Sequence, residues 1–504
     1  MARQSDLKAL LRRLFCAGGA AVLAVGAAES FAHTPAATTA PLTAITHHTI
    51  HLDGTPIAYT ATVSEVLLKD KGQPAAIGTA TAYVRDGVAD PGRRPLIFFF
   101  NGGPGASSSP LHLAFGPRTV SYGAGPGAPQ TLIDNPSTLL ADADLVFIDP
   151  VGTGYSRPLP GVSGAPFWDV TGDATSVAQI IRQEIATLGR ANSPHYLFGE
   201  SYGGVRAATL LHVAPDIPFA GVMLLSPALD MTGSNAAAGN DLPYILTLPS
   251  YAAVAWRLGV AQKDLASAPA AFEAGERFAQ TDYAAALFQG DRLDATTKQA
   301  LAARLSVLIG VPTAVLLQHD LRLDVETFRR AILQDKNEIT GRLNGSVIGS
   351  MQTYDKAQPP ADDPAMSTAG RPSPKLTVDR YYRTELNFPA PTAPYRTLAL
   401  DVNSQWRWSD ATGDRFYFNV APYLGEAMER QPSMRLFAVG GVFDLATPFG
   451  AVTYALNHAG APGSRVRIDR FVTGHMIEDD PDGLAQLRAD ALAFIAPPPV
   501  SAVR

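Results

Sequence analysis

The sequence contains one cysteine in 504 residues, which excludes a fold held together by its own disulfide bonds. It also lacks an excess of positive charge, because 40 Lys and Arg residues face 46 Asp and Glu residues and the formal net charge is −6. Without a basic surplus to neutralise phosphates, we expect no nucleic-acid partner. Charged residues make up 17% of the chain and hydrophobic residues 46%, which excludes a highly charged, disordered chain.

Long hydrophobic runs are missing too, apart from one near the N-terminus. The run Leu14–Ala28 is too short to span a membrane comfortably. Four basic residues precede it, and small residues that suit cleavage after Ala28 or Ala32 follow it. This pattern predicts a signal peptide over residues 1–32 rather than an N-terminal anchor. We therefore expect an exported protein, periplasmic or secreted, with no stable membrane insertion once the signal and its Cys16 are removed.

What the sequence does contain is a series of short, continuous apolar runs, each followed by a loop and a helical stretch such as Asp173–Leu188. Runs of this kind indicate strands that are buried on both faces of a sheet. They predict an α/β fold with a mostly parallel central sheet and helices on both faces. The runs are Pro95–Phe100, Leu145–Ile148, Tyr196–Phe198, Val222–Leu225 and Leu436–Val439.

The composition and the hydrophobic spacing of the sequence change after about residue 230. Ala- and Leu-rich segments with helical spacing replace the strand runs, and they predict an inserted helical cap. At the start of the core, an Asp53-Gly54 turn between alternating segments predicts a hairpin. The expected organisation is a signal peptide at 1–32, a flexible lead-in at 33–44, a core at 45–229, the cap at 230–396, the second part of the core at 397–497 and a tail at 498–504.

The strongest chemical signal is the turn Gly199-Glu200-Ser201-Tyr202-Gly203, which follows one predicted strand and opens a helix. A Gly-x-Ser-x-Gly turn in this context is a nucleophile elbow. Its glycines leave room for a sharp turn, which holds the serine hydroxyl exposed at the start of the helix. We therefore predict Ser201 as a nucleophile.

A serine nucleophile needs a base, and in folds with this elbow the acid and then the histidine follow the serine along the chain. Three histidines lie beyond the elbow helix: His319, His458 and His475. His475 directly follows a predicted strand, which is where a base belongs. Asp444 follows another strand and precedes His475, so we predict that it orients and stabilises the imidazole.

Two glycine-rich loops accompany the elbow. Asn101-Gly102-Gly103-Pro104-Gly105 follows a strand, and its bared N–H groups, with the N–H of Tyr202, predict an oxyanion hole. The second loop spans residues 149–156; it lacks the Lys of a phosphate-binding loop, and we expect it to shape the site. His47, His48 and His51 are interpreted as strand residues, not ligands, so we expect no metal and no cofactor.

Together, residues 101–108, 151–156, 199–204, Asp444 and 474–476 resemble the serine carboxypeptidase family, in the family's order, over about residues 45–229 and 397–497. The resemblance implies an α/β-hydrolase fold with an inserted helical cap. It also implies an acid-tolerant serine exopeptidase that releases C-terminal residues. On matching positions it implies a Ser201, Asp444 and His475 triad, oxyanion donors at Gly103 and Tyr202, and substrate contacts from Asn101, Gly102 and Glu200.

The sequence departs from the family pattern at two positions. Ala106 stands where the family usually has Cys, and Ala114 stands where it places a Glu. That Glu and the one at position 200 are expected to share a proton and hold the substrate's carboxylate. We hypothesise that Arg118 supplies a charged contact in its place.

Two enzymatic functions remain open. The first is a serine peptidase that cleaves near a peptide C-terminus, and the missing Glu raises the second, a carboxylesterase or acyltransferase with the same triad. A catalytically silent binding protein is disfavoured because nucleophile, base, acid and oxyanion loop are all present. The substrate is thus a peptide or a small acyl compound, and the oligomeric state is open.

Overall fold

A computed structural model describes residues 40–122, 130–354, 362–366, 375–409 and 418–496. The predicted signal peptide, most of the lead-in and the tail lie outside the described residues. No helix in the described ranges is both long and apolar enough to cross a membrane.

Ten strands of the described chain form one sheet, and its order defines the fold. From β7 to β14 the neighbouring strands are parallel, whereas β1, β2, β3 and β7 pair antiparallel. This order is that of an α/β-hydrolase sheet, so the predicted fold class is confirmed. The order is β1 (Thr43–Leu52), β2 (Thr55–Asp70), β3 (Gln73–Arg85), β7 (Asp144–Asp149), β4 (Leu96–Phe100), β9 (His195–Glu200), β10 (Gly221–Leu225), β13 (Arg435–Gly441) and β14 (Val466–Phe471), with β8 (Arg157–Pro158) beside β3.

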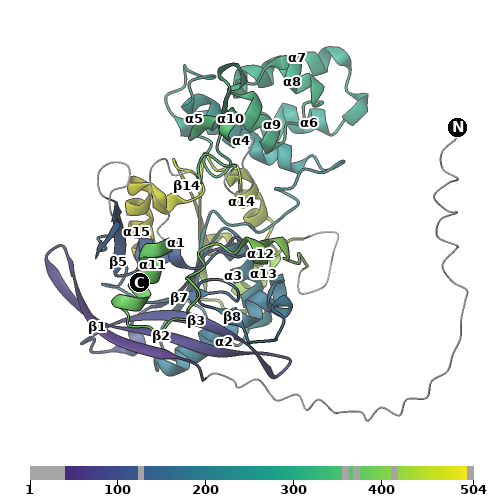
Figure 1. Cartoon of the computed structure of the whole chain (residues 1–504). Helices are drawn as coiled ribbons and strands as arrows, with labels where there is room; N and C mark the ends of the chain where they lie inside the picture. Colours follow the sequence, from purple (N-terminus) through teal and green to yellow (C-terminus); the bar gives the residue numbers. More distant parts are fainter. Residues whose placement is uncertain (1–39, 123–129, 355–361, 367–374, 410–417, 497–504) are drawn as a thin grey trace, which may run out of the picture. The chain divides into compact units, whose positions relative to one another are not determined.

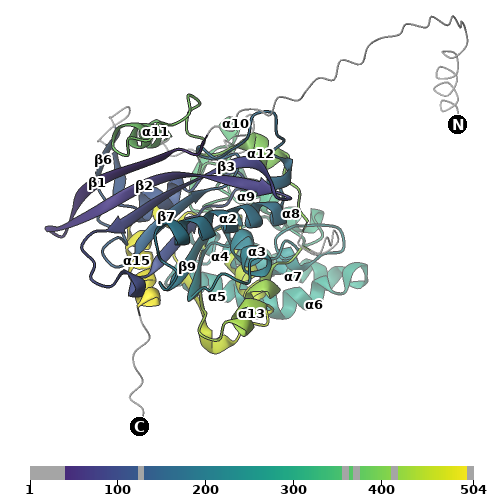
Figure 2. The ribbon, with the colours of Figure 1, turned by 90° about the horizontal axis from the view of Figure 1, so that it is seen from below.

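The alternation of side chains along β4 explains its continuous apolar run. Leu96, Phe98 and Phe100 belong to the core cluster on one face, and Ile97 and Phe99 belong to the cluster on the other. Helices cover both faces of the sheet and keep them from solvent. Figure 2 shows α2 against one of these faces. The first face is covered by α2 (Val170–Thr187), α3 (Tyr202–Val213), α13 (Ala421–Arg430) and α14 (Phe449–Asn457), and the second by α1 (Ser109–Phe115), α11 (Lys375–Thr384) and α15 (Pro481–Ile495).

The N-terminal hairpin is longer than the sequence pattern predicts. Its turn lies at the expected pair, where Asp53 has φ 50° and Gly54 φ 77°. However, β1 already begins at Thr43, inside the predicted flexible lead-in. Alternate β1 residues are exposed, so its polar face concealed the strand from a search for apolar runs.

A cluster of helices follows β10 (Figure 1). It has its own apolar core, which also takes in Val442, Phe443, Leu445 and Phe449 from the region after β13. The side chains of Ser267, Asp294 and Asp324 cap three of its helices, α5, α7 and α9. The helices are α4 (Leu242–Arg257), α5 (Ala268–Phe278), α6 (Ala284–Leu287), α7 (Ala295–Ile309), α8 (Thr313–Gln318), α9 (Val325–Ala331) and α10 (Met351–Tyr354).

The return to the core differs from the expectation that the sheet resumes near Thr397. α11 already contributes Val378, Tyr381 and Tyr382 to the core on the second face of the sheet. α12 (Leu400–Ser404) and α13 then precede the next strand, which begins at Arg435. The sequence patterns also do not predict two small hairpins, because their strands are short and mostly not buried. They are β5 (Arg118–Tyr122) with β6 (Gln130–Asp134), and β11 (Glu338–Thr340) with β12 (Ile348–Ser350).

Candidate active site

The elbow lies where the end of β9 meets the start of α3. Between them, Ser201 adopts φ 58° and ψ −122°, a region that residues other than glycine rarely occupy. A Cβ on Gly199 would lie 2.5 Å from the carbonyl oxygen of Gly203, so this turn requires glycine. The backbone of Ser201 is held by hydrogen bonds with Leu225, Gly204 and Ala228.

The predicted base and acid come together at the ends of two neighbouring strands. Asp444 follows β13 and is fully buried, and His475 follows β14 and is 5% exposed. His475 Nδ1 lies 2.7 Å from Asp444 Oδ2. The other oxygen, Asp444 Oδ1, accepts the N–H groups of Ala446 at 2.8 Å and Thr447 at 3.0 Å. The carboxylate is therefore fixed at both oxygens, and one of them faces the imidazole.

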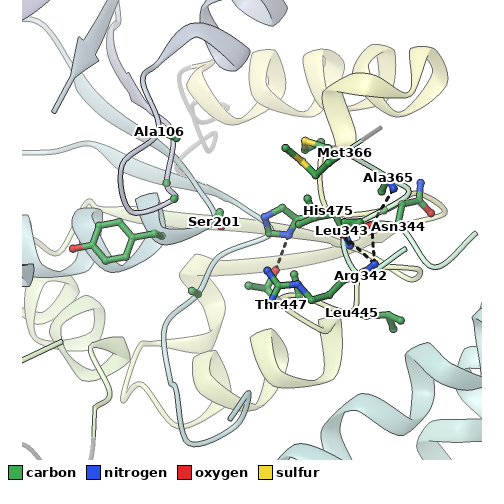
Figure 3. Close-up of a pocket in the computed structure, with 18 of the residues that line it drawn as sticks. Ala106, Ser201, Arg342, Leu343, Asn344, Ala365, Met366, Leu445, Thr447 and His475 are labelled. Carbon is green, nitrogen blue, oxygen red and sulfur yellow. Dashed lines mark hydrogen bonds between the residues drawn. The ribbon is translucent and has the colours of Figure 1, made fainter. Parts of the chain in front are cut away.

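Thr447 is a site residue that the sequence reading missed. Its hydroxyl lies 2.7 Å from Asp444 Oδ2, 3.0 Å from His475 Nδ1 and 2.9 Å from the carbonyl of Ser226 (Figure 3). The only signal for it is its position three residues after Asp444, in the turn that brings the chain back to the carboxylate.

The electrostatic surroundings of His475 favour its protonated form. Burial lowers the pKa of His475, but the Asp444 carboxylate and, to a smaller extent, Glu478 outweigh that effect, and the pKa is raised above its ordinary value. Arg342, which lines the same cleft, opposes the rise. An imidazole beside a buried carboxylate can accept a proton and hold it as a stabilised cation.

A segment of the helical insertion fixes the loop that carries His475. The N–H of His475 donates to the carbonyl of Leu343 at 2.7 Å, and its carbonyl accepts the Ser226 hydroxyl at 2.7 Å. Figure 3 shows the imidazole between Ser201 on one side and Arg342, Leu343 and Asn344 on the other. The other two histidines are not among the residues lining this cleft: His319 ends α8, and His458 is exposed at the end of α14.

The loop after β4 packs directly on the elbow. A Cβ on Gly102 would lie 2.7 Å from the carbonyl oxygen of Glu200 and 2.9 Å from Ser201 Cβ. In the described chain, no hydrogen bond occupies the N–H of Gly103 or of Tyr202. Both groups are therefore free to donate to an oxygen that develops negative charge beside Ser201.

Replacement of Gly102 by alanine is expected to lower kcat about 10²- to 10³-fold, the usual effect of losing one oxyanion donor. The new Cβ meets backbone atoms that cannot give way, so the loop must move away from Ser201. The measurement is kcat on a simple ester together with the unfolding midpoint in urea. Gly463→Ala is the control, since no atom lies within 4 Å of the Cβ that it adds. Equal kcat in the two variants would contradict the assignment of this loop to the oxyanion hole.

Asn101 and Glu200 form a buried pair beside the nucleophile. They are 2% and 5% exposed, and the Asn101 amide donates to Glu200 Oε2. Asn101 Oδ1 accepts the N–H of Leu111 at 3.2 Å, which fixes the orientation of the amide. Burial and the nearby Glu478 carboxyl raise the pKa of Glu200 well above its ordinary value.

Beneath the elbow lies a buried ion pair. Arg206 on α3 is fully buried, and its Nε donates to Asp173 Oδ2 at 2.7 Å. Another guanidinium nitrogen donates to the carbonyl of Asn101, and the group lies over the rings of Phe100 and Tyr202. Arg206 therefore joins α2, the oxyanion loop and the elbow helix.

We expect Arg206→Met to lower the free energy of unfolding by about 3–5 kcal/mol, because it leaves the Asp173 carboxylate buried without its partner. Urea unfolding measures the change. The matched control is Arg182→Met, whose partner Asp216 is exposed and whose loss should cost at most about 1 kcal/mol. Equal losses in the two variants would show that Arg206 does not hold the elbow in place.

The loop at residues 149–156 supports the site from behind. Asp149 Oδ1 accepts the N–H of Ser108 at 2.9 Å, the hydroxyl of Ser108 at 2.8 Å and the hydroxyl of Tyr395 at 3.0 Å. Burial raises the pKa of Asp149 to about 6, although these three hydrogen bonds oppose the rise. This loop ties the segment after the oxyanion loop to the core.

Arg118 has a different role from the one hypothesised. Its Nε lies 3.1 Å from Glu385 Oε2, and another guanidinium nitrogen pairs with Asp134. It joins the β5–β6 hairpin to the end of α11 and is not among the residues that line the cleft. Two carboxylates already satisfy this cation, so we do not retain Arg118 as a contact for the substrate's carboxylate.

Ser201, His475, Gly102, Gly103, Asn101 and Glu200 all line one cleft of about 2950 Å³. A space of this size exceeds what a small ligand fills and admits an extended substrate. Residues of the helical insertion, such as Arg342 and Asn344, form its opposite wall. Among the described residues, no three His, Cys, Asp or Glu side chains are grouped to hold a metal ion.

The strand order, the elbow and the buried Asp–His pair define an α/β-hydrolase with a serine-type site. Residues 83–215 match the family model named serine carboxypeptidase. That segment contains the oxyanion loop and the elbow but neither Asp444 nor His475. The resemblance to the serine carboxypeptidase family, predicted from the motifs, is therefore confirmed for this segment of the core.

Individual relatives agree with this family. A serine carboxypeptidase of Caenorhabditis elegans (ctsa-3.1) is 33% identical over 124 residues, which cover 23% of this chain and 20% of the relative. Carboxypeptidase Y of Candida albicans is 29% identical over 155 residues, covering 30% of this chain and 25% of the relative. The chain thus aligns with only about a fifth to a quarter of the length of these two relatives.

The solved structures that resemble this chain do so with low TM-scores and low sequence identity. A proline iminopeptidase from Mycobacterium smegmatis has a TM-score of 0.38 and 16% identity, and covers 86% of this chain and 97% of its own. A peroxisomal α/β-hydrolase from Saccharomyces cerevisiae has a TM-score of 0.35 and 12% identity, with 92% of both chains covered. The fold assignment accordingly rests on the strand order.

Proposed function

We propose that the protein is a serine carboxypeptidase, which removes C-terminal residues from peptides through an acyl-enzyme on Ser201. The observation that carries the proposal is the buried Asp444–His475 pair, whose histidine lines one cleft with the elbow serine, in a chain whose core resembles serine carboxypeptidases.

In the proposed reaction, His475 takes the Ser201 proton as the hydroxyl oxygen attacks the scissile carbonyl carbon. The N–H groups of Gly103 and Tyr202 donate to the carbonyl oxygen as it becomes negative. His475 then gives the proton to the leaving amine, the C–N bond breaks, and water repeats the sequence to release the acid. Asp444 keeps the Nδ1 proton in place, so that Nε2 is the basic nitrogen throughout.

The test is product analysis with a peptide that is acetylated at its N-terminus and free at its C-terminus. We expect mass spectrometry to show sequential loss of C-terminal residues. It should also show labelling of Ser201 by a fluorophosphonate, in proportion to lost activity. An intact peptide, or internal cleavage alone, would contradict the proposal.

One observation favours a second candidate, a carboxylesterase or acyltransferase. Ala114 lines the cleft where the family resemblance expects a Glu for the substrate's carboxylate. The same triad acts on an ester, because the fold and triad do not determine the source of the acyl group. Good ester turnover with no release of C-terminal residues would identify this second function.

Export remains part of the proposal. Its support is the charged start, apolar run and small-residue exit within residues 1–32. Fractionation of cells expressing the full chain, followed by N-terminal sequencing of the exported form, tests it. Retention of uncleaved chain in the cytoplasm would contradict export.

A further inference from the structure

The cleft contains a second buried carboxyl group that the proposed reaction does not use. Glu478 lies in a short 3₁₀ helix, Ile477–Asp479, three residues after His475. Its side chain lines the same cleft as Ser201 and Glu200. Both of its carboxyl oxygens are buried, although the residue as a whole is partly exposed. Neither oxygen has a hydrogen-bond donor within the described part of the chain.

The neighbour that Glu478 does meet is Glu200. The two carboxyl groups interact directly: Glu478 raises the pKa of Glu200, whereas the hydrogen bond with Glu200 lowers the pKa of Glu478 and so opposes the rise that burial causes there. Two carboxylates offer only acceptors, so they can bond to each other only when one of them carries a proton. A buried carboxyl without a donor, facing another buried carboxyl, is the arrangement that holds such a proton.

The position of Glu478 also fits the gap left by Ala114. Ala114 lies on α1, is 6% exposed and lines the cleft. The short helix that carries Glu478 packs against α1. Ala114 and Glu478 therefore lie on two elements that contact each other, and both residues line the cleft.

We propose that Glu478 takes the place of the carboxyl missing at position 114 and, with Glu200, binds the free C-terminal carboxylate of the substrate. The proposal deepens the function proposed above and rests on it. Asn101 fixes Glu200 through its amide, and the turn after His475 fixes Glu478. The catalytic histidine and this specificity residue are thus carried by one loop.

The pair makes binding depend on pH. Burial, together with Asp479, raises the pKa of Glu478 to about 8, while His475 opposes the rise; Glu200 faces Glu478, Asp479 and Asp444. Because the pKa values are raised, the pair keeps at least one proton in acid and loses its protons as the pH rises. A protonated pair donates hydrogen bonds to a carboxylate, whereas a dianion repels it. Affinity for a free C-terminus should therefore be highest in acid and fall toward alkaline pH.

The experiment measures competitive inhibition of ester turnover by an N-acetylated amino acid and by its amide, from acid to alkaline pH. Native protein should bind the acid better than the amide, and the difference should shrink as the pH rises. Glu478→Ala should weaken inhibition by the acid about tenfold or more in acid, the usual effect of losing a hydrogen bond to a charged group, with inhibition by the amide unchanged. Glu478→Gln keeps a donor and should flatten the pH dependence.

Two further variants separate this role from a structural one. In Glu478→Ala/Ala114→Glu, the carboxyl returns on α1, and binding of the acid should be restored. Asp482→Asn removes one negative charge from an exposed residue of the same region and should leave every inhibition constant unchanged. The kcat of each variant on the ester reports whether the fold and triad are intact.

Unchanged preference for the acid in Glu478→Ala would overturn the proposal. So would loss of that preference only in Arg342→Ala, which would make Arg342 the carboxylate ligand. Native protein that is not inhibited by the acid would also overturn it. Inhibition that depends on Glu478, without release of C-terminal residues from peptides, would instead leave this inference standing and refute the proposed function.

Discussion

Replacement of Ser201 by alanine is expected to lower turnover about 10⁶-fold, as loss of a triad nucleophile does in other serine enzymes. The strained turn at φ 58° holds Ser201 in the cleft that His475 also lines. Alanine removes the hydroxyl without adding volume, so the fold should persist. The measurement is kcat on both an ester and a free peptide, with the urea midpoint of the same preparation.

The control for this prediction is Ser163→Ala, which removes a hydroxyl from an exposed loop. It should keep native turnover. Ser201→Ala should also lose fluorophosphonate labelling, whereas the control should retain it. A loss of less than about tenfold in Ser201→Ala would show that another group is the nucleophile.

Asp444→Asn should lower kcat about 10⁴-fold, the effect seen when a triad carboxylate becomes an amide. The reason is visible in the hydrogen bonds. Asp444 Oδ1 accepts two backbone N–H groups, from Ala446 and Thr447, so the asparagine oxygen will take that side. Its NH₂ then faces His475 Nδ1, which becomes the acceptor. The proton moves to Nε2, and the imidazole can no longer take a proton from Ser201.

This tautomer argument is tested by kcat measured beside the structure of the variant. Asp482→Asn makes the same chemical change at an exposed position and should be neutral. We expect Asp444→Asn to keep the native urea midpoint within about 1 kcal/mol, because the substitution retains shape. Full activity in Asp444→Asn would assign the orienting role to another group, such as Thr447.

The sequence predicts those site residues whose positions follow from a nearby backbone feature, such as a glycine-rich turn or the end of a strand. The elbow needs glycines on both sides of Ser201, and Asp444 and His475 each follow a strand that the sequence predicts. Thr447 and Glu478 were not predicted, although each lies three residues after a member of the predicted triad. Their side chains reach the cleft only because a tight turn follows each strand end, and that turn leaves no pattern in composition.

The elements of the fold divide in the same way into those that the sequence predicts and those that it does not. Strands buried on both faces are evident in the sequence, because every side chain along β4 must be apolar. The half-exposed β1 and the short β5–β6 hairpin leave no such run: β1 was predicted only near its turn, and the β5–β6 hairpin was not predicted. The hypothesis for Arg118 rested on proximity in sequence to Ala114, which does not reveal that Asp134 and Glu385 pair with the guanidinium.

The central claim, that this protein is a carboxypeptidase, is tested most directly with one blocked dipeptide, prepared with a free C-terminus and with an amidated one. The measurement is kcat/KM for both on the native protein, from acid to neutral pH. We predict that the free acid is cleaved far better than the amide and that this preference is largest in acid. Equal cleavage of both forms, or cleavage of neither with good turnover of a simple ester, would contradict the claim.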